Sequence, residues 1–421
     1  MRILHTADWH FGRLLEGRDR RAEQEAFVRE LCQIVEERSI DLVLIAGDIY
    51  DSVNPPAWAE ELFYEALERL CAGGKRGVVV IAGNHDHPER IRAAAPLARR
   101  HGIVLLGLPK ETAFTSEPQD TDERVQILDA GASWLEIAIP GVNHHAVILA
   151  LPYPSEARLK ELISETFTPE QMQLAFSERI ATLLDELSGK FREDTVNLVA
   201  SHLFVMGGAE TESERPIQIG GTHTVSTSAF PKNADYVALG HLHRLQKLGD
   251  APLIRYSGSP LAYSFSEAGQ SKAVVIVEIT PGDAGTTIQE EIVYLTSGRP
   301  LAKWKATQGI AQVEQWLSEE RDKGSWIDLE IHVSDVIDPA EFQRLRKLSD
   351  DFVKIQRVLV AKETQEESEG LEPKLNEMSP EQLFRRFYER KRGVQPDEQV
   401  VALFARLMTQ ATEQAEGEDV E

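Results

Sequence analysis

Five short polar motifs contain the side chains of this sequence that could form one metal-binding site. The motifs are Asp8-Trp9-His10, Gly47-Asp48, Gly83-Asn84-His85, Ser201-His202 and Gly240-His241-Leu242-His243. Their donor atoms are carboxylate oxygens, imidazole nitrogens and an amide oxygen, which favour manganese, iron or zinc over a soft metal. These donors are more numerous than one ion needs, and an aspartate that bridges two ions ~3.5–4 Å apart would explain the surplus.

Each motif follows an apolar run that predicts a short strand. The runs are 2–7, 42–46, 77–82, 196–200 and 236–239, and helical apolar patterns cover 20–38 and 57–72. Strands that alternate with helices indicate a layered α/β domain, in which functional side chains lie in the loops beyond the strand ends. One motif alone is weak evidence, because Gly-Asn-His-Asp is usually a turn. Five motifs in this order are strong evidence for one metal site.

The rest of the chain divides into smaller segments. A turn-forming run at 281–285 predicts the end of a first domain that covers residues 1–280. Alternating strand and helix patterns beyond it predict a small α/β domain at 286–362. An acidic linker at 363–379 then leads to two amphipathic helices within 380–412. In the small domain we expect helices at 309–321 and 339–350 and strands at 326–333 and 355–361.

Composition limits the function classes. The formal net charge of −24 over 421 residues opposes binding to DNA phosphates. However, 363–381 hold seven acidic residues and one lysine, and 409–421 hold five acidic residues and no base, so a linker and a tail carry nearly half of the excess. No run approaches the ~20 apolar residues of a membrane helix, and the first residues lack a signal-peptide pattern. Two cysteines without a disulfide framework suit a reducing cytoplasm.

The ordered motifs resemble the calcineurin-like metallophosphoesterase superfamily, whose pattern is Asp-x-His, Gly-Asp, Gly-Asn-His, His and Gly-His-x-His. Within it, four segments are similar to the SbcD family of bacterial nuclease subunits. They are His5-Thr6-Ala7-Asp8-Trp9-His10-Phe11-Gly12, Ala46-Gly47-Asp48-Ile49-Tyr50-Asp51 with Pro55-Pro56, Gly240-His241-Leu242-His243 and Tyr256-Ser257-Gly258-Ser259-Pro260. The resemblance covers about residues 1–280 through motifs. It implies an α/β fold, namely a layered metallophosphoesterase sandwich with a small α/β capping domain and a C-terminal helical pair.

The resemblance also implies a role for each motif residue. Two manganese ions, or magnesium or another divalent metal, would share Asp48 as a bridging ligand. The first ion would be held by Asp8, His10, Asp48 and His243, and the second by Asp48, Asn84, His202 and His241. His85 would be a catalytic histidine outside the ligand set that stabilises or protonates the leaving 3′ oxygen. Because the chain has Asp51 where other relatives carry a histidine, a second auxiliary histidine is not expected.

The implied activity is that of a DNA nuclease with a partner. It would be a 3′–5′ exonuclease on double-strand ends and an endonuclease on single strands and hairpins, acting in DNA repair, recombination and replication. The partner would be an SbcC-like coiled-coil ATPase, in a heterotetramer that contains a homodimer of this chain. The candidate partner contacts are Phe384, Phe387, Phe404 and Leu407. The candidate DNA contacts, weighed against ordinary solvated residues, are Arg13, Arg18, Arg20, Arg21 and His87.

Two other functions stay open. A metallophosphodiesterase for nucleotides or other small phosphoesters would use the same site, but it would not need residues 286–412. Protein phosphatases of the superfamily usually continue Gly-Asp-x-x-Asp with Arg-Gly, whereas Ser52-Val53 follow Asp51 here. A non-catalytic interaction subunit is disfavoured, because all seven expected ligands and His85 are present.

Overall fold

The computed structural model describes residues 1–116, 123–159, 169–214, 224–282, 285–333, 339–359, 384–389, 395–397, 400–401 and 403–404. Residues Met1–Val360 form one compact unit and Ala361–Glu421 form a second. Within the described part of the chain, no helix combines the length and the hydropathy that crossing a membrane requires.

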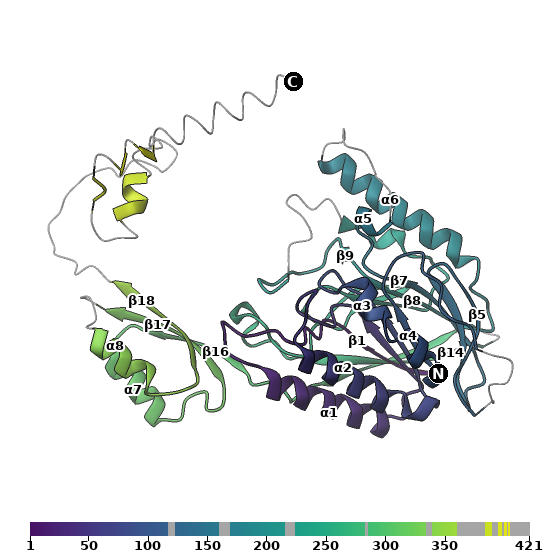
Figure 1. Cartoon of the computed structure of the whole chain (residues 1–421), viewed down its shortest axis with the longest axis horizontal. Coiled ribbons are helices and arrows are strands. Elements are labelled where there is room, and N and C mark those ends of the chain that lie inside the picture. The colour runs from purple at the N-terminus through teal and green to yellow at the C-terminus, as the bar shows by residue number, and fades with distance from the viewer. Residues whose placement is uncertain are drawn as a thin grey trace, which may run out of the picture. The chain divides into compact units, whose positions relative to one another are not determined.

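A six-stranded sheet forms one layer of the larger unit, and its strands β1 and β14 are labelled in Figure 1. Its strands are β1 (Arg2–Thr6), β2 (Leu42–Ala46), β3 (Gly77–Ile81), β4 (Ile103–Leu106), β14 (Ala273–Thr280) and β15 (Thr287–Tyr294). Their order is β15-β14-β1-β2-β3-β4. The strands β1 to β4 are parallel, whereas β14 is antiparallel to both β1 and β15. The strands β2 and β3 are apolar and buried along their whole length, as parallel strands covered on both faces are.

A seven-stranded sheet forms the second layer. Its strands are β5 (Gln126–Gly131), β6 (Trp134–Ala138), β7 (Ala146–Leu151), β8 (Val196–His202), β11 (Tyr236–Gly240), β12 (Gln246–Asp250) and β13 (Leu253–Tyr256). Their order is β12-β13-β11-β8-β7-β6-β5. The central strands β7, β8, β11 and β13 are parallel. A short parallel pair, β9 (Phe204–Val205) and β10 (Thr224–Val225), follows β8 along the chain.

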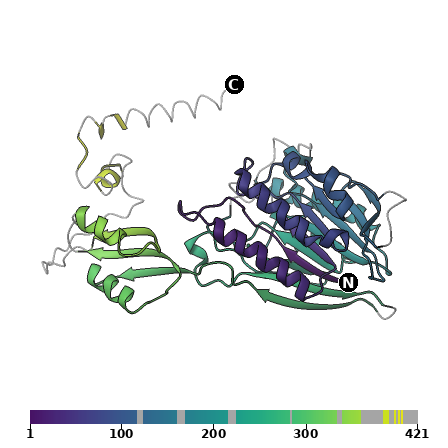
Figure 2. The ribbon, with the colours of Figure 1, turned by 60° about the horizontal axis from the view of Figure 1, so that its bottom comes forward.

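Helices cover both outer faces of the two sheets (Figures 1 and 2). They are α1 (Arg21–Glu37), α2 (Ala57–Leu70), α3 (Pro88–Arg92), α4 (Ala95–Ala98), α5 (Glu156–Leu159) and α6 (Pro169–Ser188). The apolar core between the sheets includes Leu44 of β2 and Ile148 of β7. Phe27 of α1 packs on the outer face of the first sheet, and Phe176 of α6 packs on that of the second. The four layers confirm the predicted α/β sandwich.

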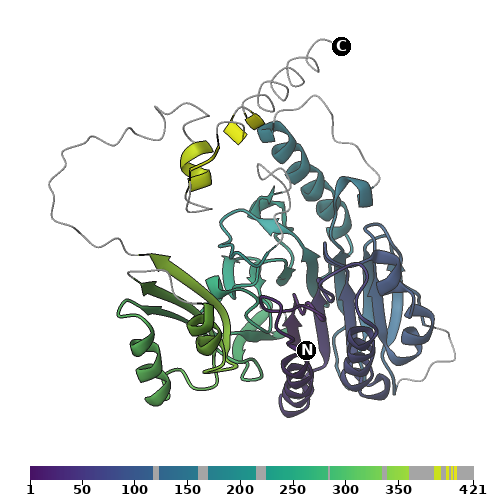
Figure 3. The ribbon, with the colours of Figure 1, turned by 60° about the vertical axis from the view of Figure 1, so that its left-hand side comes forward.

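A small parallel sheet follows in the same unit (Figure 3). Its elements are β16 (Leu301–Ala306), α7 (Ile310–Ser318), β17 (Trp326–Val333), α8 (Pro339–Arg346) and β18 (Phe352–Leu359), with strand order β16-β17-β18. It has its own apolar core around Trp304. The predicted start of this domain at residue 286 is wrong, because 287–294 form β15, which pairs with β14 in the six-stranded sheet. The run at 281–285 thus connects two paired strands, although it resembles a domain boundary in sequence.

Short pieces of the second unit belong to the described residues. Residues 384–389 are helical, and the rings of Phe384 and Phe404 stack with centroids 4.2 Å apart. The side chains of Phe387 and Leu403 are 58% and 55% exposed. The predicted linker at 363–379 and the predicted contact Leu407 lie outside the described residues. The helical pair therefore stays a prediction.

His5 joins the two sheets through hydrogen bonds and makes stability depend on pH. Its Nε2–H donates to Leu239 O over 3.1 Å, because a carbonyl oxygen only accepts, so Nδ1 accepts from the Tyr236 hydroxyl at 2.8 Å. Burial lowers the pKa of His5 to about 3. The unfolded chain binds a proton near pH 6.5, and the folded chain does so only near pH 3. Stability is therefore complete above pH 6.5 and falls as the pH drops, by about 1.4 kcal/mol per pH unit.

We expect the metal-free protein to lose about 2 kcal/mol more of its unfolding free energy between pH 7.5 and pH 5 than the variant His5→Asn loses. Urea unfolding at both pH values measures the difference. Other buried histidines are common to both proteins and cancel in the comparison. Equal losses in the two proteins would show that His5 is not held neutral in the core.

Candidate metal centre

The carboxyl ends of parallel strands in both sheets bring the five motifs together. Asp8, Asp48 and Asn84 follow β1, β2 and β3 of the six-stranded sheet. His202 ends β8, and His241 follows the neighbouring strand β11 of the seven-stranded sheet. Because the sheets pack face to face, one edge of the sandwich carries all five motifs.

Four of the motif residues have left-handed backbone conformations. Their φ angles are +56° at Asp8, +46° at His10, +50° at Asp48 and +108° at His241. Such conformations cost of the order of 1–3 kcal/mol each in residues other than glycine, and they are found mainly at functional sites. At Gly83 a Cβ atom would stand 2.1 Å from Asp48 Oδ1, so only glycine permits this approach of the two loops.

One ligand group consists of Asp8, His10 and His243. All three residues are buried, and their ligand atoms lie within 4.8 Å of one another. His10 Nε2 lies 3.0 Å from His243 Nε2. The other ring nitrogen of His243, Nδ1, lies 2.5 Å from Ser213 Oγ and 3.9 Å from Glu267 Oε1. These contacts fix the ring so that Nε2 faces the group.

A second ligand group consists of Asp48, His202 and His241, with Asn84 beside it. Asn84 Oδ1 lies 2.8 Å from His202 Nε2 and 3.2 Å from His241 Nδ1. The Nδ1–H of His202 donates to Ala46 O over 2.9 Å, so its Nε2 carries a lone pair that faces the amide oxygen. Two acceptor atoms at this distance repel each other unless a cation lies between them. The donor set therefore fits a metal ion of the manganese, iron or zinc type.

Asp48 faces both ligand groups. Its Oδ2 lies 3.5 Å from His202 Nε2 and 3.6 Å from His10 Nε2. Its Oδ1 accepts a hydrogen bond of 2.8 Å from the backbone N–H of His85, which fixes the carboxylate plane. A carboxylate in this position is suited to bridging two ions.

Burial sets the protonation of these groups. It lowers the pKa of His202, and together with neighbouring imidazoles it holds the pKa values of His10 and His241 well below their ordinary value. Burial and the nearby Asp48 carboxylate hold the pKa of Asp8 well above its usual range. Burial, the largest single influence, acts to raise the pKa of Asp48, but the surrounding histidines and the backbone N–H of His85 together outweigh it and the pKa is lowered. The imidazoles are thus neutral and able to bind a metal, and a cation would relieve the repulsion between the carboxylates.

His85 lines an open groove of about 520 Å³ beside the ligand groups. Its Nδ1–H donates to Asp51 O over 2.7 Å, so the ring orientation is fixed. Its Nε2 lies 3.9 Å from Asp48 Oδ2 and faces the metal centre. His85 also forms a third potential ligand group with His10 and Asp51. The groove is lined by Gly12, Arg13, Leu14, Asp51, His85, Glu212, Ser213 and Glu214.

Known proteins resemble this chain along nearly its whole length. The calcineurin-like phosphoesterase family matches residues 1–245, and the type 5 capsule protein repressor C-terminal domain matches residues 297–392. The chain is 46% identical over 416 residues to the SbcD subunit of the nuclease SbcCD from Bacillus subtilis (strain 168), covering 98% of this chain and 99% of that protein. This chain belongs to the SbcD family. It is also 36% identical over 291 residues to the SbcD subunit of the nuclease SbcCD from Rhodobacter capsulatus, covering 68% of each protein.

Membership in the SbcD family agrees with the site geometry. Both relatives carry the name of a nuclease subunit, and the matched phosphoesterase family covers every motif up to His243. The chain is therefore a metal-dependent hydrolase of the nuclease class. The family resemblance inferred from the motifs is confirmed, and so is the fold class.

The structure adds residues that hold the ligands of this SbcD chain in place, which the sequence analysis missed. The buried carboxylate of Asp86 accepts hydrogen bonds from the backbone N–H groups of Gly83, Ile49 and Tyr50, at 2.8, 3.2 and 3.0 Å. It thereby ties the loop after β2 to the loop after β3. Its position directly after Gly-Asn-His was a signal that could have identified it. Ser213 gave no such signal, because it lies 30 residues from His243 in the sequence.

Arg158 holds the loop after β3 with two hydrogen bonds. It lies in α5, which follows β7 of the seven-stranded sheet along the chain. Its Nη1 donates to Gly83 O over 2.7 Å and its Nη2 donates to Asp86 O over 2.8 Å. These two carbonyls flank Asn84 and His85, so the guanidinium holds the backbone that presents both side chains.

We expect Arg158→Ala to lower kcat and to weaken the binding of one metal ion, each by about 10- to 100-fold, as changes to residues that orient metal ligands do. Arg158→Lys should fall between the wild type and Arg158→Ala, because lysine has no planar fork to reach both carbonyls. Manganese titration and steady-state cleavage measure the two effects. Unchanged metal affinity and kcat in Arg158→Ala would show that the loop holds its shape without Arg158.

The predicted DNA contacts fall into different environments. Arg13 lines the groove at the metal centre, and its Nη2 donates to Ser213 O over 2.6 Å. Arg18 is exposed and donates to Phe352 O of β18. His87 is exposed at the start of α3. As DNA contacts, all three stay predictions.

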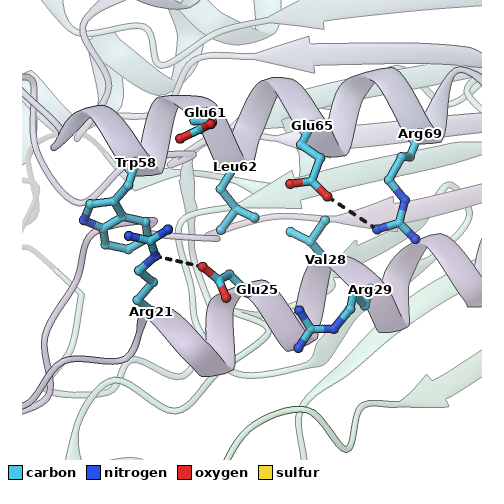
Figure 4. A pocket seen from close by; sticks show the side chains of 9 residues that line it. All are labelled: Arg21, Glu25, Val28, Arg29, Trp58, Glu61, Leu62, Glu65 and Arg69. Carbon is cyan, nitrogen blue, oxygen red and sulfur yellow. Dashed lines mark hydrogen bonds and ion pairs between the residues drawn. The ribbon is translucent and has the colours of Figure 1, made fainter.

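Two of these arginines have structural partners. The Arg20 side chain is buried and pairs with Glu23, with Nε 2.5 Å from Oε1. The prediction that Arg20 contacts DNA is therefore wrong for this structure, because no face of its guanidinium reaches solvent. Arg21 lies in the cavity between α1 and α2, where it pairs with Glu25 and stacks on Trp58 (Figure 4). Arg20 is thus held for packing, whereas the Arg21 side chain is half exposed and its contact with DNA stays a prediction.

Proposed function

We propose that this chain hydrolyses phosphodiester bonds of DNA with two divalent metal ions that share Asp48. The position of Asp48 Oδ2 between His202 Nε2 and His10 Nε2 carries this proposal. Asp8, His10, Asp48 and His243 would hold one ion, and Asp48, Asn84, His202 and His241 the other. When bound, the ions would neutralise charge on the phosphoryl oxygens and lower the pKa of water.

His85 is proposed to act on the leaving oxygen. Its Nδ1–H is engaged by Asp51 O, so Nε2 is the ring atom that faces a group in the groove, and it can donate there only from the doubly protonated imidazolium form of the ring. A phosphodiester that binds at the two ligand groups would place its leaving 3′ oxygen near this atom. Donation by Nε2 would then stabilise the charge that develops on the oxygen as the bond breaks.

Manganese is the metal we propose for this site. Imidazoles supply four of the seven proposed ligands, and imidazole suits transition metals better than it suits magnesium, which prefers oxygen ligands. Metal-free protein should therefore regain more nuclease activity with manganese than with magnesium at equal concentration. Equal recovery with magnesium would contradict the choice of manganese but not the proposal that Asp48 bridges two ions.

The proposed substrates are DNA ends and hairpins. The support is the name of the relatives, which are nuclease subunits, together with the open groove of about 520 Å³ beside the ligand groups. We propose 3′–5′ exonuclease activity on duplex ends and endonuclease activity on single strands and hairpins. Linear duplexes labelled at either end and a labelled hairpin, incubated with manganese, test both activities. Shortening from the 5′ end, or cleavage of small phosphodiesters but of no DNA, would overturn the proposal.

The second compact unit is proposed to dock an SbcC-like coiled-coil ATPase. The relatives are named as subunits of SbcCD, which implies a second kind of subunit in their complex. Phe387 and Leu403 are large apolar side chains more than half exposed, and a partner surface would cover them. A homodimer of this chain within a heterotetramer, working in the cytoplasm, completes the proposal. The two free buried cysteines, Cys32 and Cys71, agree with a reducing compartment.

We expect a chain truncated after residue 360 to remain folded, to bind metal and to cleave DNA weakly, but to lose binding to the ATPase partner. The reason is that the first compact unit ends at Val360 and contains every proposed ligand. Calorimetry, metal analysis and co-purification with the partner measure the three properties. Full-strength partner binding by the truncated chain would place docking on the first unit. Aggregation or metal loss would make the second unit part of the core.

A further inference from the structure

We propose that Phe204 and its neighbours form a subsite for an unpaired nucleobase beside the second ligand group. This inference rests on the proposed nuclease function and deepens it, because it concerns which nucleotides the site accepts. The two histidines of the second group each have an aromatic neighbour. The Phe204 ring packs edge-on against His241 and the Tyr153 ring packs edge-on against His202, both with centroids 6.3 Å apart.

The segment that carries Phe204 is held firmly. The Tyr256 hydroxyl donates to Leu203 O and accepts from Val205 N–H, at 2.6 and 2.9 Å. The Val205 side chain is completely buried in the core beneath α6. The pairing of β9 with β10 continues through Met206 N–H, which donates to Val225 O over 2.9 Å. The backbone on both sides of Phe204 is thus fixed, and a ring presented there is pre-organised for a ligand.

An apolar surface continues from Phe204 into solvent. Met206 is 46% exposed and Leu174 of α6 is 61% exposed. The helix α6 contacts the residue that follows β9, since Gln173 Nε2 lies 3.7 Å from Met206 Sδ. Phe204 is itself half-buried against the core beneath α6, and its ring contacts a proposed metal ligand.

The two sides of the metal centre therefore differ in chemistry. The groove beside His85 is lined mainly by polar and charged side chains, among them Arg13, Asp51 and Glu212. Beside the second group lie the Phe204 ring and the Tyr153 ring, over which the Arg158 guanidinium lies at 5.2 Å.

An unpaired base fits the second side best. Aromatic rings, thioethers and stacked guanidinium groups bind the faces of bases and tolerate any sequence. In a duplex those faces are covered by neighbouring pairs, so the patch would bind a nucleotide whose pairing is broken. The base next to a phosphate on the ligand groups would lie within reach of a ring that touches His241. We infer that cleavage is preceded by local melting and that Phe204 selects the melted nucleotide.

The test uses the full-length protein with manganese and single-stranded oligonucleotides that contain one cleavable bond. One substrate is normal, and two others carry an abasic residue on either side of that bond. We expect Phe204→Ala to lower kcat/KM on the normal substrate by about tenfold, the size of one base-stacking contact, and on one abasic substrate by less than about twofold. Phe204→Trp should cleave all substrates nearly as the wild type does, because it keeps a ring. Phe114→Ala, an exposed phenylalanine on another surface, serves as the matched control.

Each other outcome overturns the subsite. Equal losses on normal and abasic substrates would mean that Phe204 acts only by supporting His241. Unchanged kcat/KM would mean that the ring touches no substrate. Normal partner-free cleavage combined with weaker binding of the ATPase would assign the patch to a protein partner. Failure of the wild type to cleave any of these oligonucleotides would instead refute the proposed nuclease function.

Discussion

Replacing Asp48 with alanine is expected to abolish nuclease activity and to remove at least one of two manganese ions. Its carboxylate faces both ligand groups, with Oδ2 3.5 Å from His202 Nε2 and 3.6 Å from His10 Nε2. Loss of one ion forfeits several kcal/mol of charge stabilisation in the transition state, which corresponds to a loss of about 1000-fold or more in kcat/KM. Cleavage of a labelled duplex and metal analysis after dialysis measure the two effects.

Asp129→Ala is the matched control for this substitution. Asp129 is an exposed aspartate of β5, so its variant should bind metal and cleave DNA as the wild type does. Asp48→Asn separates charge from shape, because it keeps one oxygen at the bridging position but loses the negative charge. If Asp48→Ala retained two ions per chain and most of its activity, Asp48 would not be the shared ligand.

His85→Ala is expected to keep both metal ions and to lose about 100- to 10,000-fold in kcat, the usual range for a proton-transfer group. Two features of the structure separate the role of residue 85 in metal binding from its role in catalysis. The Asp48 carboxylate contacts the backbone N–H of residue 85, which alanine retains. The imidazole Nε2 is the part that faces the centre from the groove. Single-turnover cleavage and metal analysis of the same preparation test both statements.

His101→Ala, which removes an exposed histidine, controls for histidine loss as such. A substrate whose leaving oxygen is replaced by sulfur sharpens the assignment, since a thiolate leaves without a proton. The deficit of His85→Ala should shrink on this substrate. Loss of a metal ion in His85→Ala would instead place His85 in the ligand group that it forms with His10 and Asp51.

The sequence predicted best those parts of the fold where the local signal is strong. The strands β2 and β3 were located within a residue because parallel strands buried on both faces are continuous apolar runs. The strand β15 was missed because Gln289, Glu290 and Glu291 in its middle place polar side chains on both faces, and a turn-like run precedes it. The strand β16 alternates lysines with buried residues, so its apolar run is broken.

The site shows the same division between local and non-local information. Motif order and residue types indicated which side chains would meet, and the parallel strand ends explain why they do. The contacts of Ser213 with His243 and of Arg158 with Gly83 join residues separated by 30 and 75 positions. No pattern in the sequence marks such pairs, because each depends on how a loop crosses the edge of the sandwich. The burial of Arg20 likewise follows from packing against Glu23 and Ala262.

The measurement that tests the two-ion account most directly is nuclease activity as a function of manganese equivalents. Metal-free protein at a concentration far above the dissociation constants would be titrated with manganese, and cleavage of a labelled duplex would be followed at each step. Because both ligand groups share Asp48 and both act on one phosphate, we predict that activity reaches its plateau at two equivalents per chain. Full activity at one equivalent, or activity without metal, would contradict the account.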